Sequence, residues 1–499
     1  MHRRRLRRSL TALLTLLLLT AACASEADES LLSADRDSTR TDDQQTSPDS
    51  TEGDGNQGND TLDWEDCSFG ECAELDVPVD YDQPDGPTLT LSIARAPAQG
   101  ERIGSLFVNP GGPGGTATDF VSAMEFALPS DIVEHFDIVG VDPRGLGSSE
   151  IDCGDDPDPQ ELYGVDYSID SPEDTTALLD VSQQYVDACE AGAGDLLPYL
   201  GTENVARDID AVRAAMGDEQ MSYLGYSYGT AIGQTLAQLF PDRIRAMVLD
   251  GVLELGPTGV ELATDQAAGF ETALQSYADD CNADEDCPLA PDAIGAIEQL
   301  QAQVEQAPIP ADPRDLGPGE LSTGLPYPLY DPMLWSDLSE AVADALDGDG
   351  SAMVDLADQY LDIADFDIYF AVNCLDNDWP DTADELLAAG KAAAVESPHF
   401  GESIVNDYVR CAIWPAEEEP LPAVTAPGTP PILVVSTRND PATPYEAGVR
   451  TAERLENGVL LTYEGDGHTV VGQGVDCVDD AVASYLVDLE PPEDGTTCD

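Results

Sequence analysis

A serine, an aspartate and a histidine stand in that order along the chain, each in a distinctive local sequence. Ser227 is the centre of a Gly-Tyr-Ser-Tyr-Gly pentapeptide, and Asp440 and His468 follow it near the C-terminal end. A serine hydroxyl is a weak nucleophile, so a neutral histidine must take its proton and a carboxylate must fix the imidazole tautomer. These residue types predict nucleophilic catalysis by Ser227, with His468 as the base and Asp440 as the acid that orients it.

The pentapeptide alone is a weak signal, because Gly-x-Ser-x-Gly also occurs by chance. Here apolar residues precede it and a helix-forming run, residues 231–240, follows it. A strand–turn–helix elbow of this kind lifts a serine hydroxyl out of the fold on a strained turn. Gly225 and Gly229 fit such a turn, because side chains at these positions would clash where backbone segments pass closely.

The proposed acid and base each follow a predicted strand. Asp440 comes after the apolar residues 431–435, and His468 comes after residues 458–463. Parallel sheets gather their functional groups at the carboxyl ends of strands. His468 is the only histidine that follows Asp440. Asp466 is the local competitor for the acid, although we expect it to shape the turn before His468.

A glycine-rich run at residues 109–115 follows another predicted strand. Small residues there allow a backbone N–H to approach a developing oxyanion, and the residue after the nucleophile supplies the second donor. We therefore assign Gly112 and Tyr228 as backbone donors. The alternative is a glycine turn without a ligand; a phosphate cradle is disfavoured because no lysine follows the run.

Strands and helices alternate on both sides of the pentapeptide, which predicts a mostly parallel central sheet with helices on both faces. The predicted strands are residues 75–79, 89–93, 103–108, 136–141, 244–249, 431–435 and 458–463. Between them, residues 253–425 change to helical runs and proline-rich loops, which predicts a helical cap inserted between two core segments, 63–252 and 426–499.

Composition limits the function classes. The 499 residues are 42% hydrophobic, enough for a substantial core, and carry a formal net charge of −79. So large a negative charge excludes nucleic-acid binding through the phosphates. The chain has a single lysine, Lys391. Acidity with little lysine fits work in high salt, and G+C-rich coding also depletes lysine; both explanations stay open.

The N-terminus is predicted to be an export signal. Residues 1–22 combine an arginine-rich start with an apolar run that is too short to span a bilayer. Cys23 follows in a context similar to a bacterial lipoprotein box, so we expect it to be lipidated, with simple secretion as the alternative. Residues 23–62 are polar and acidic and cannot bury enough surface to order themselves, which predicts a flexible linker.

Eleven cysteines minus Cys23 leave ten, an even number for an oxidising compartment. Proximity suggests five pairs, but sequence does not determine connectivity. The suggested pairs are Cys67–Cys72, Cys153–Cys189, Cys281–Cys287, Cys374–Cys411 and Cys477–Cys498. A zinc site is the competing interpretation, disfavoured because C-x-x-C spacing is missing and only four histidines occur. We expect no metal and no cofactor.

Taken together, the motifs resemble the α/β-hydrolase peptidases of the proline-iminopeptidase and secreted tripeptidyl-aminopeptidase type. The matching segments are residues 111–114, 142–149, 225–229, 440–444 and 467–468. One departure is Pro110, where cytosolic relatives carry histidine. The resemblance implies an α/β-hydrolase fold and an exopeptidase acting on free N-termini. It also implies cap carboxylates that hold the substrate ammonium, for which Asp376 and Asp378 are the candidates, with a solvated surface role as the alternative.

The leading hypothesis is thus an exported serine aminopeptidase that releases tripeptides or single residues such as proline through an acyl-enzyme. We expect it to act as a monomer on peptide substrates, in contact with the membrane only through a lipid on Cys23. An esterase or other small-molecule hydrolase is the alternative within the fold. An inactive lipid-anchored binding protein is the alternative from another class, and the intact Ser227, Asp440 and His468 argue against it.

Overall fold

The computed structural model describes residues 61–499 except 69, 155–161, 163 and 170. The predicted signal at residues 1–22, the lipidation site at Cys23 and nearly all of the predicted linker at 23–62 lie outside these residues. Within the described part, no helix combines the length and apolar character needed to cross a membrane.

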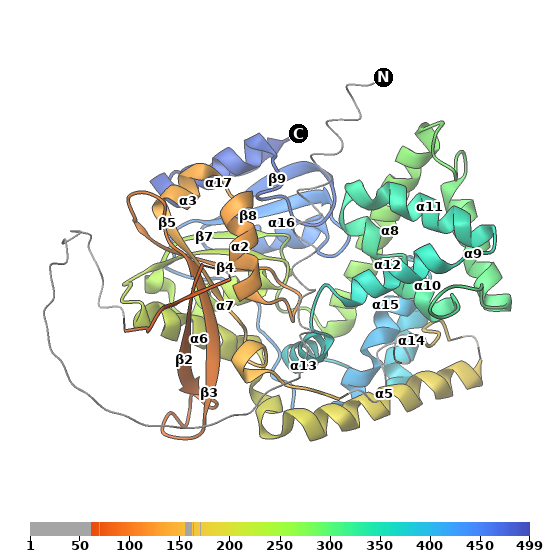
Figure 1. The fold of residues 1–499 in the computed structure, drawn as a ribbon, viewed down its shortest axis with the longest axis horizontal. Helices are drawn as coiled ribbons and strands as arrows, with labels where there is room; N and C mark the ends of the chain where they lie inside the picture. The colour runs from red at the N-terminus through yellow and green to blue at the C-terminus, as the bar shows by residue number, and fades with distance from the viewer. Residues whose placement is uncertain (1–60, 69, 155–161, 163, 170) are drawn as a thin grey trace, which may run out of the picture.

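A ten-stranded sheet forms the centre of the molecule, in the order β1-β2-β3-β5-β4-β6-β7-β8-β9-β10 (Figure 1). From β5 to β10 all neighbours are parallel, whereas β1, β2 and β3 join antiparallel at one edge. The predicted, mostly parallel α/β-hydrolase sheet is thus confirmed. The strands are β1 (Glu65–Cys67), β2 (Gly70–Pro78), β3 (Thr88–Ala96), β4 (Gly104–Asn109), β5 (Phe136–Val141), β6 (Met221–Tyr226), β7 (Ile244–Asp250), β8 (Ile432–Asn439), β9 (Gly458–Asp466) and β10 (Thr496–Cys498).

Helices cover both faces of this sheet. Because successive side chains of a strand point to opposite faces, Tyr223 of β6 packs in one core cluster and Leu224 in another. The first cluster joins the sheet to α5 (Pro172–Ala193), α6 (Thr202–Ala215), α7 (Gly229–Leu239) and α16 (Tyr445–Arg454). The second joins it to α2 (Ala117–Ala127), α3 (Ser130–His135) and α17 (Asp476–Asp488). Burial on both faces explains why β5 and β6 are continuously buried.

Between β7 and β8 the chain forms a helical body beside the sheet, drawn green to light blue in Figure 1. Part of this body has its own core, in which Phe270, Ile297, Leu338 and Val354 are buried together. Its helices are α8 (Gly259–Ala283), α9 (Ala293–Gln306), α10 (Pro318–Gly324), η4 (Tyr327–Tyr330), η5 (Pro332–Leu334), α11 (Trp335–Leu346), α12 (Ser351–Leu361), α13 (Phe366–Asp376), α14 (Ala383–Ala393), α15 (Gly401–Asp407) and η6 (Tyr408–Ile413). We call this body the cap.

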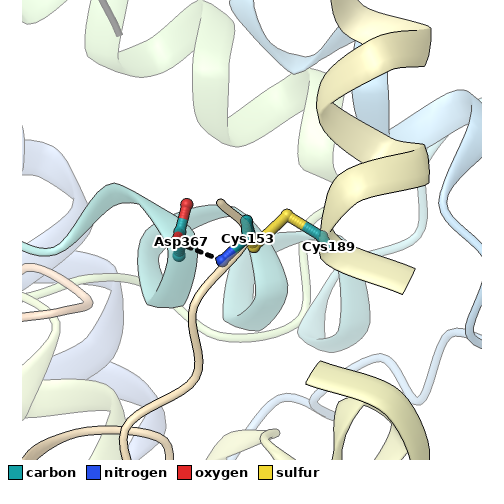
Figure 2. A group of neighbouring side chains, drawn as sticks. All are labelled: Cys153, Cys189 and Asp367. Carbon is teal, nitrogen blue, oxygen red and sulfur yellow. Dashed lines mark hydrogen bonds between the residues drawn. A yellow bond between two sulfur atoms is a disulfide. The ribbon is translucent and has the colours of Figure 1, made fainter. Parts of the chain in front are cut away.

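Five disulfides join cysteines that are near one another in the sequence, as proximity suggested. Figure 2 shows one of them, Cys153–Cys189, beside Asp367 of α13. These three residues form a group of the kind that can hold a metal ion. Their two sulfur atoms are bonded to each other, however, and the Cys153 N–H donates to the Asp367 carboxylate at 2.9 Å. The group therefore links the core to the cap.

Candidate active site

The turn after β6 holds Ser227 in a conformation that few non-glycine residues adopt. Its φ is 52°, in the left-handed region. The Ser227 N–H donates to the Asp250 carbonyl at 2.9 Å, and the Thr230 N–H donates back to the Ser227 carbonyl at 2.8 Å. A Cβ at Gly225 would lie 2.4 Å from the Gly229 carbonyl oxygen, so glycine is required there. The structure thus contains the strained elbow that the pentapeptide predicts.

The loop after β9 brings His468 to the carboxylate that follows β8. Nδ1 of His468 lies 2.8 Å and 3.0 Å from the two Asp440 oxygens. Asp440 is 2% exposed, and its Oδ1 also accepts the N–H groups of Ala442 and Thr443, each at 2.9 Å. Burial lowers the pKa of His468, but the charge and hydrogen bond of Asp440 outweigh it and leave this pKa raised. Asp440 therefore fixes the orientation of the imidazole and would stabilise the imidazolium that forms when Nε2 takes a proton.

The other imidazole nitrogen, Nε2, is not engaged by Asp440. Nε2 of His468 is buried and has no hydrogen-bond partner among the described residues, and His468 lines the same cavity as Ser227. Such a nitrogen is able to take a proton once a substrate brings the two groups together, since catalytic hydrogen bonds often tighten only in the complex. Asp466, the competing acid, accepts instead from the Asn439 amide at 2.9 Å and from the Ser276 hydroxyl.

The glycine loop after β4 lies against the elbow. A Cβ at Gly111 would lie 2.8 Å from the Cβ of Ser227 and 3.1 Å from the Tyr228 nitrogen. Gly112 and Tyr228 both line the cavity, and neither donates its N–H to another residue of the described part. Two backbone donors beside a serine hydroxyl have the chemistry needed to hold a developing oxyanion.

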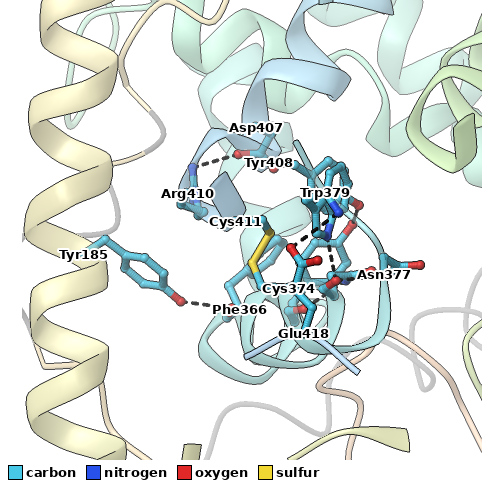
Figure 3. The surroundings of a disulfide bond; sticks show 12 residues. Tyr185, Phe366, Cys374, Asn377, Trp379, Asp407, Tyr408, Arg410, Cys411 and Glu418 are labelled. Carbon is cyan, nitrogen blue, oxygen red and sulfur yellow. Dashed lines mark hydrogen bonds and ion pairs between the residues drawn. A yellow bond between two sulfur atoms is a disulfide. The ribbon is translucent and has the colours of Figure 1, made fainter. Parts of the chain in front are cut away.

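The cavity has a volume of about 250 Å³, and the cap supplies an aromatic wall to it. The wall consists of Tyr330, Tyr360, Phe366, Tyr369, Trp379 and Tyr408. Trp379 stacks on Tyr408 with ring centroids 4.5 Å apart. The Cys374–Cys411 disulfide, next to both rings in Figure 3, crosslinks α13 to η6, the elements that carry much of the wall. Sequence reasoning missed this wall, because only the tertiary packing of the cap brings these aromatic residues to one cavity.

Three charged residues line the cavity besides His468. Arg450 lies 2.5 Å from Glu254 and 2.9 Å from Asp265. Glu254 is buried and also pairs with Arg454, so both of its oxygens are engaged. The Asp265 side chain is 52% exposed and, among the described residues, is paired through Oδ2 with Arg450. Asp265 is therefore the lining carboxylate that is most open to a cationic ligand.

The two cap acids proposed from the sequence lie elsewhere. Asp376 is 6% exposed, and its carboxylate accepts the Thr202 N–H at 3.1 Å and the Thr202 hydroxyl at 2.5 Å. That hydroxyl is also 2.7 Å from the Tyr228 hydroxyl. Burial raises the pKa of Asp376 to about 7. Asp378 is exposed, and neither acid lines the cavity. Asp376 thus contacts Tyr228 indirectly, through the hydroxyl of Thr202.

Comparison with known proteins supplies relatives over most of the chain. A family model described as TAP-like protein matches residues 397–498. The serine protease Hip1 of Mycobacterium tuberculosis is 39% identical over 455 residues, covering 86% of this chain and 87% of the relative. Carboxylesterase B of M. tuberculosis is 38% identical over 451 residues, covering 86% of each. A tripeptidyl aminopeptidase of Streptomyces lividans is 31% identical over 473 residues, covering 88% of this chain and 86% of the relative.

The geometry predicts unequal effects for the two neighbouring acids. Asp440→Asn should slow fluorophosphonate labelling of the serine by about three to four orders of magnitude, because the imidazole loses its tautomer and its charge partner. The matched change Asp466→Asn should leave labelling within about threefold of wild type, because Asp466 contacts Asn439 and Ser276 instead of His468. Labelling rates at pH 8 measure both. If Asp466→Asn slowed labelling more than Asp440→Asn does, Asp466 would be the acid instead.

Proposed function

Because the chain belongs to the α/β-hydrolase family that includes the serine protease Hip1 and the tripeptidyl aminopeptidases, we propose that it is a serine peptidase that removes short fragments from free peptide N-termini. The observation that carries the proposal is one cavity that contains Ser227 on a strained elbow, His468 bound to Asp440, and two free backbone donors. The aligned residues of this relative cover 86% of the chain, so the family relationship extends well beyond residues 397–498, which the family model matches.

In the proposed mechanism, Ser227 Oγ attacks the scissile carbonyl and its proton passes to Nε2 of His468. Asp440 stabilises the imidazolium through Nδ1, and the N–H groups of Gly112 and Tyr228 hold the oxyanion. As the C–N bond breaks, His468 gives the proton to the leaving amine and an acyl-enzyme remains on Ser227. In the second half of the reaction, His468 takes a proton from the attacking water, and the new oxyanion collapses with cleavage of the ester C–Oγ bond. His468 returns the proton to Ser227 Oγ, and the fragment leaves with a new carboxyl group.

The shape of the cavity supports cleavage near a chain end. Its volume of about 250 Å³ is below the range of about 300–1,000 Å³ usual for drug-sized ligands. The cap bounds it with aromatic rings, which favour a short fragment with apolar side chains over a long polypeptide running through. We propose that Asp265, rather than Asp376 or Asp378, binds the substrate ammonium, because it lines the cavity and its carboxylate is half exposed.

An esterase is the second candidate, and the observation in its favour is the carboxylesterase B relative. The nucleophile, base and oxyanion donors serve ester and amide cleavage alike. The two functions differ in the leaving group and in the need for a carboxylate that binds an ammonium, which an ester substrate does not require.

We also propose that the enzyme is exported by the signal at residues 1–22 and retained at the outer face of the membrane by a lipid on Cys23, with residues 23–62 as its tether. The arginine-rich start, the apolar run and the cysteine after two alanines support this location. It works there as a monomer on peptides.

A substrate panel separates peptidase from esterase. Tripeptidyl and aminoacyl amides with a free N-terminus should be cleaved, and the same compounds N-acetylated should lose most of their kcat/KM, because the ammonium loses its carboxylate partner. Release of the fluorogenic amine measures each, with Ser227→Ala as the inactive control. Equal cleavage of blocked and free peptides would rule out the aminopeptidase, and turnover of esters alone would favour the esterase.

The ammonium site has its own test. Asp265→Asn should raise KM for free N-terminal substrates about tenfold, the loss of one charge-assisted hydrogen bond, with kcat for a simple ester unchanged. Asp378→Asn is the matched control, since this acid is exposed and outside the cavity lining. Steady-state kinetics on both variants give the answer. A higher KM in Asp378→Asn with none in Asp265→Asn would return the role to Asp378.

A further inference from the structure

A second carboxylate, Asp250, lies next to the Asp440–His468 pair. It is the last residue of β7 and is fully buried. Its backbone carbonyl accepts the Ser227 N–H at 2.9 Å. Its Oδ2 accepts the N–H groups of Val470 and Val471, at 2.8 Å and 2.7 Å. One residue therefore holds the backbone of the nucleophile's turn and the backbone of the loop that carries His468.

That loop needs such support. Thr469, between His468 and Val470, has a φ of 65°, a conformation that costs a β-branched residue free energy and persists only where its surroundings impose it. On one side the His468 N–H donates to the Tyr330 carbonyl of the cap at 2.8 Å. On the other side the two bonds to Asp250 hold the residues that follow. The backbone of the His468 loop is thus held by the cap on one side and by the end of β7 on the other.

Asp250 also acts on the imidazole through its charge. The Cα of the next residue, Gly251, is close enough to the ring that an added Cβ would lie 3.1 Å from Cε1 of His468. Oδ1 of Asp250 is buried without a hydrogen-bond partner in the described part. Burial raises the pKa of Asp250 to about 7; its two amide bonds and the charge of His468 oppose this rise, and the charge of Asp440 adds to it. The other ionisable neighbour is the buried Tyr226.

We propose that Asp250 is a positioning residue that holds the His468 loop over Ser227 and stabilises the imidazolium through space, alongside Asp440. The inference rests on the proposed role of His468 as the base. An imidazolium forms during the attack and must be stabilised in a site with little water. A negative charge near the ring lowers the energy of that state, whereas a purely structural contact to Val470 and Val471 leaves it unchanged.

The test compares Asp250→Asn with Asp137→Asn. Asp137 is also a buried carboxylate of the sheet, bound by the Ala98 N–H and Arg102, but it stands at the opposite, N-terminal end of β5. Because the charge of Asp250 raises the pKa of His468, its removal lowers that pKa. The acid limb of the pH profile of fluorophosphonate labelling should therefore move to lower pH, by about one unit, in Asp250→Asn only.

Labelling keeps this test separate from the substrate class. A wild type that labels at Ser227 but cleaves no free N-terminal peptide contradicts the proposed function alone. An acid limb in Asp250→Asn that stays at the position of wild type and Asp137→Asn overturns the present inference, whatever happens to the rate. If Asp250→Asn does not fold, ¹⁵N-histidine spectra of the wild type replace it: the His468 ring should record two inflections, from itself and from Asp250, and a single inflection overturns the inference.

Discussion

The backbone turn at Ser227 is the constraint on which the rest of the site depends. A serine at a φ of 52° persists only because its surroundings fix both of its peptide groups: the carbonyl of Asp250 in β7 accepts its N–H, and the N–H of Thr230 in α7 donates to its carbonyl. The parallel register aligns the ends of β4, β6 and β7, so Asn109, Gly225 and Leu249 are neighbours across the sheet. The glycine loop after β4 and Asp250 at the end of β7 therefore flank the serine from either side. Strain at one residue is maintained by the hydrogen bonding of three strands.

The cap forms part of the cavity that contains Ser227. Its rings form one wall of the cavity, and Tyr330 also binds the His468 backbone and packs edge-on to the imidazole with centroids 5.5 Å apart. Asp376 at the end of α13 fastens the cap to the start of α6 through Thr202, directly behind Tyr228. The cap and the proposed catalytic residues thus share direct contacts. A change in cap packing would therefore reach His468 through Tyr330, and Tyr228 through Thr202.

Much of this arrangement could be predicted from sequence because local patterns encode it. The apolar runs predicted the inner strands, and residues 136–141 coincide with β5. His468 was identifiable because no other histidine follows Asp440. The three-residue β10 was missed, since Thr496 and Thr497 are polar and pair with β9 only through the fold. Sequence could not tell that Asp376 is buried against Thr202 while Asp265 faces the cavity, because both are acids in helical, acid-rich segments and only tertiary packing separates them.

The central claim is that Ser227 carries the N-terminal fragment of a peptide as an ester during turnover. Acid quenching within milliseconds of mixing with a tripeptidyl ester or amide, followed by intact-mass and peptide mass spectrometry, tests this directly. The account predicts a transient gain equal to the acyl fragment, located on the peptide that contains Ser227 and missing in Ser227→Ala. Turnover with no adduct at any time, or an adduct on another residue, would contradict it.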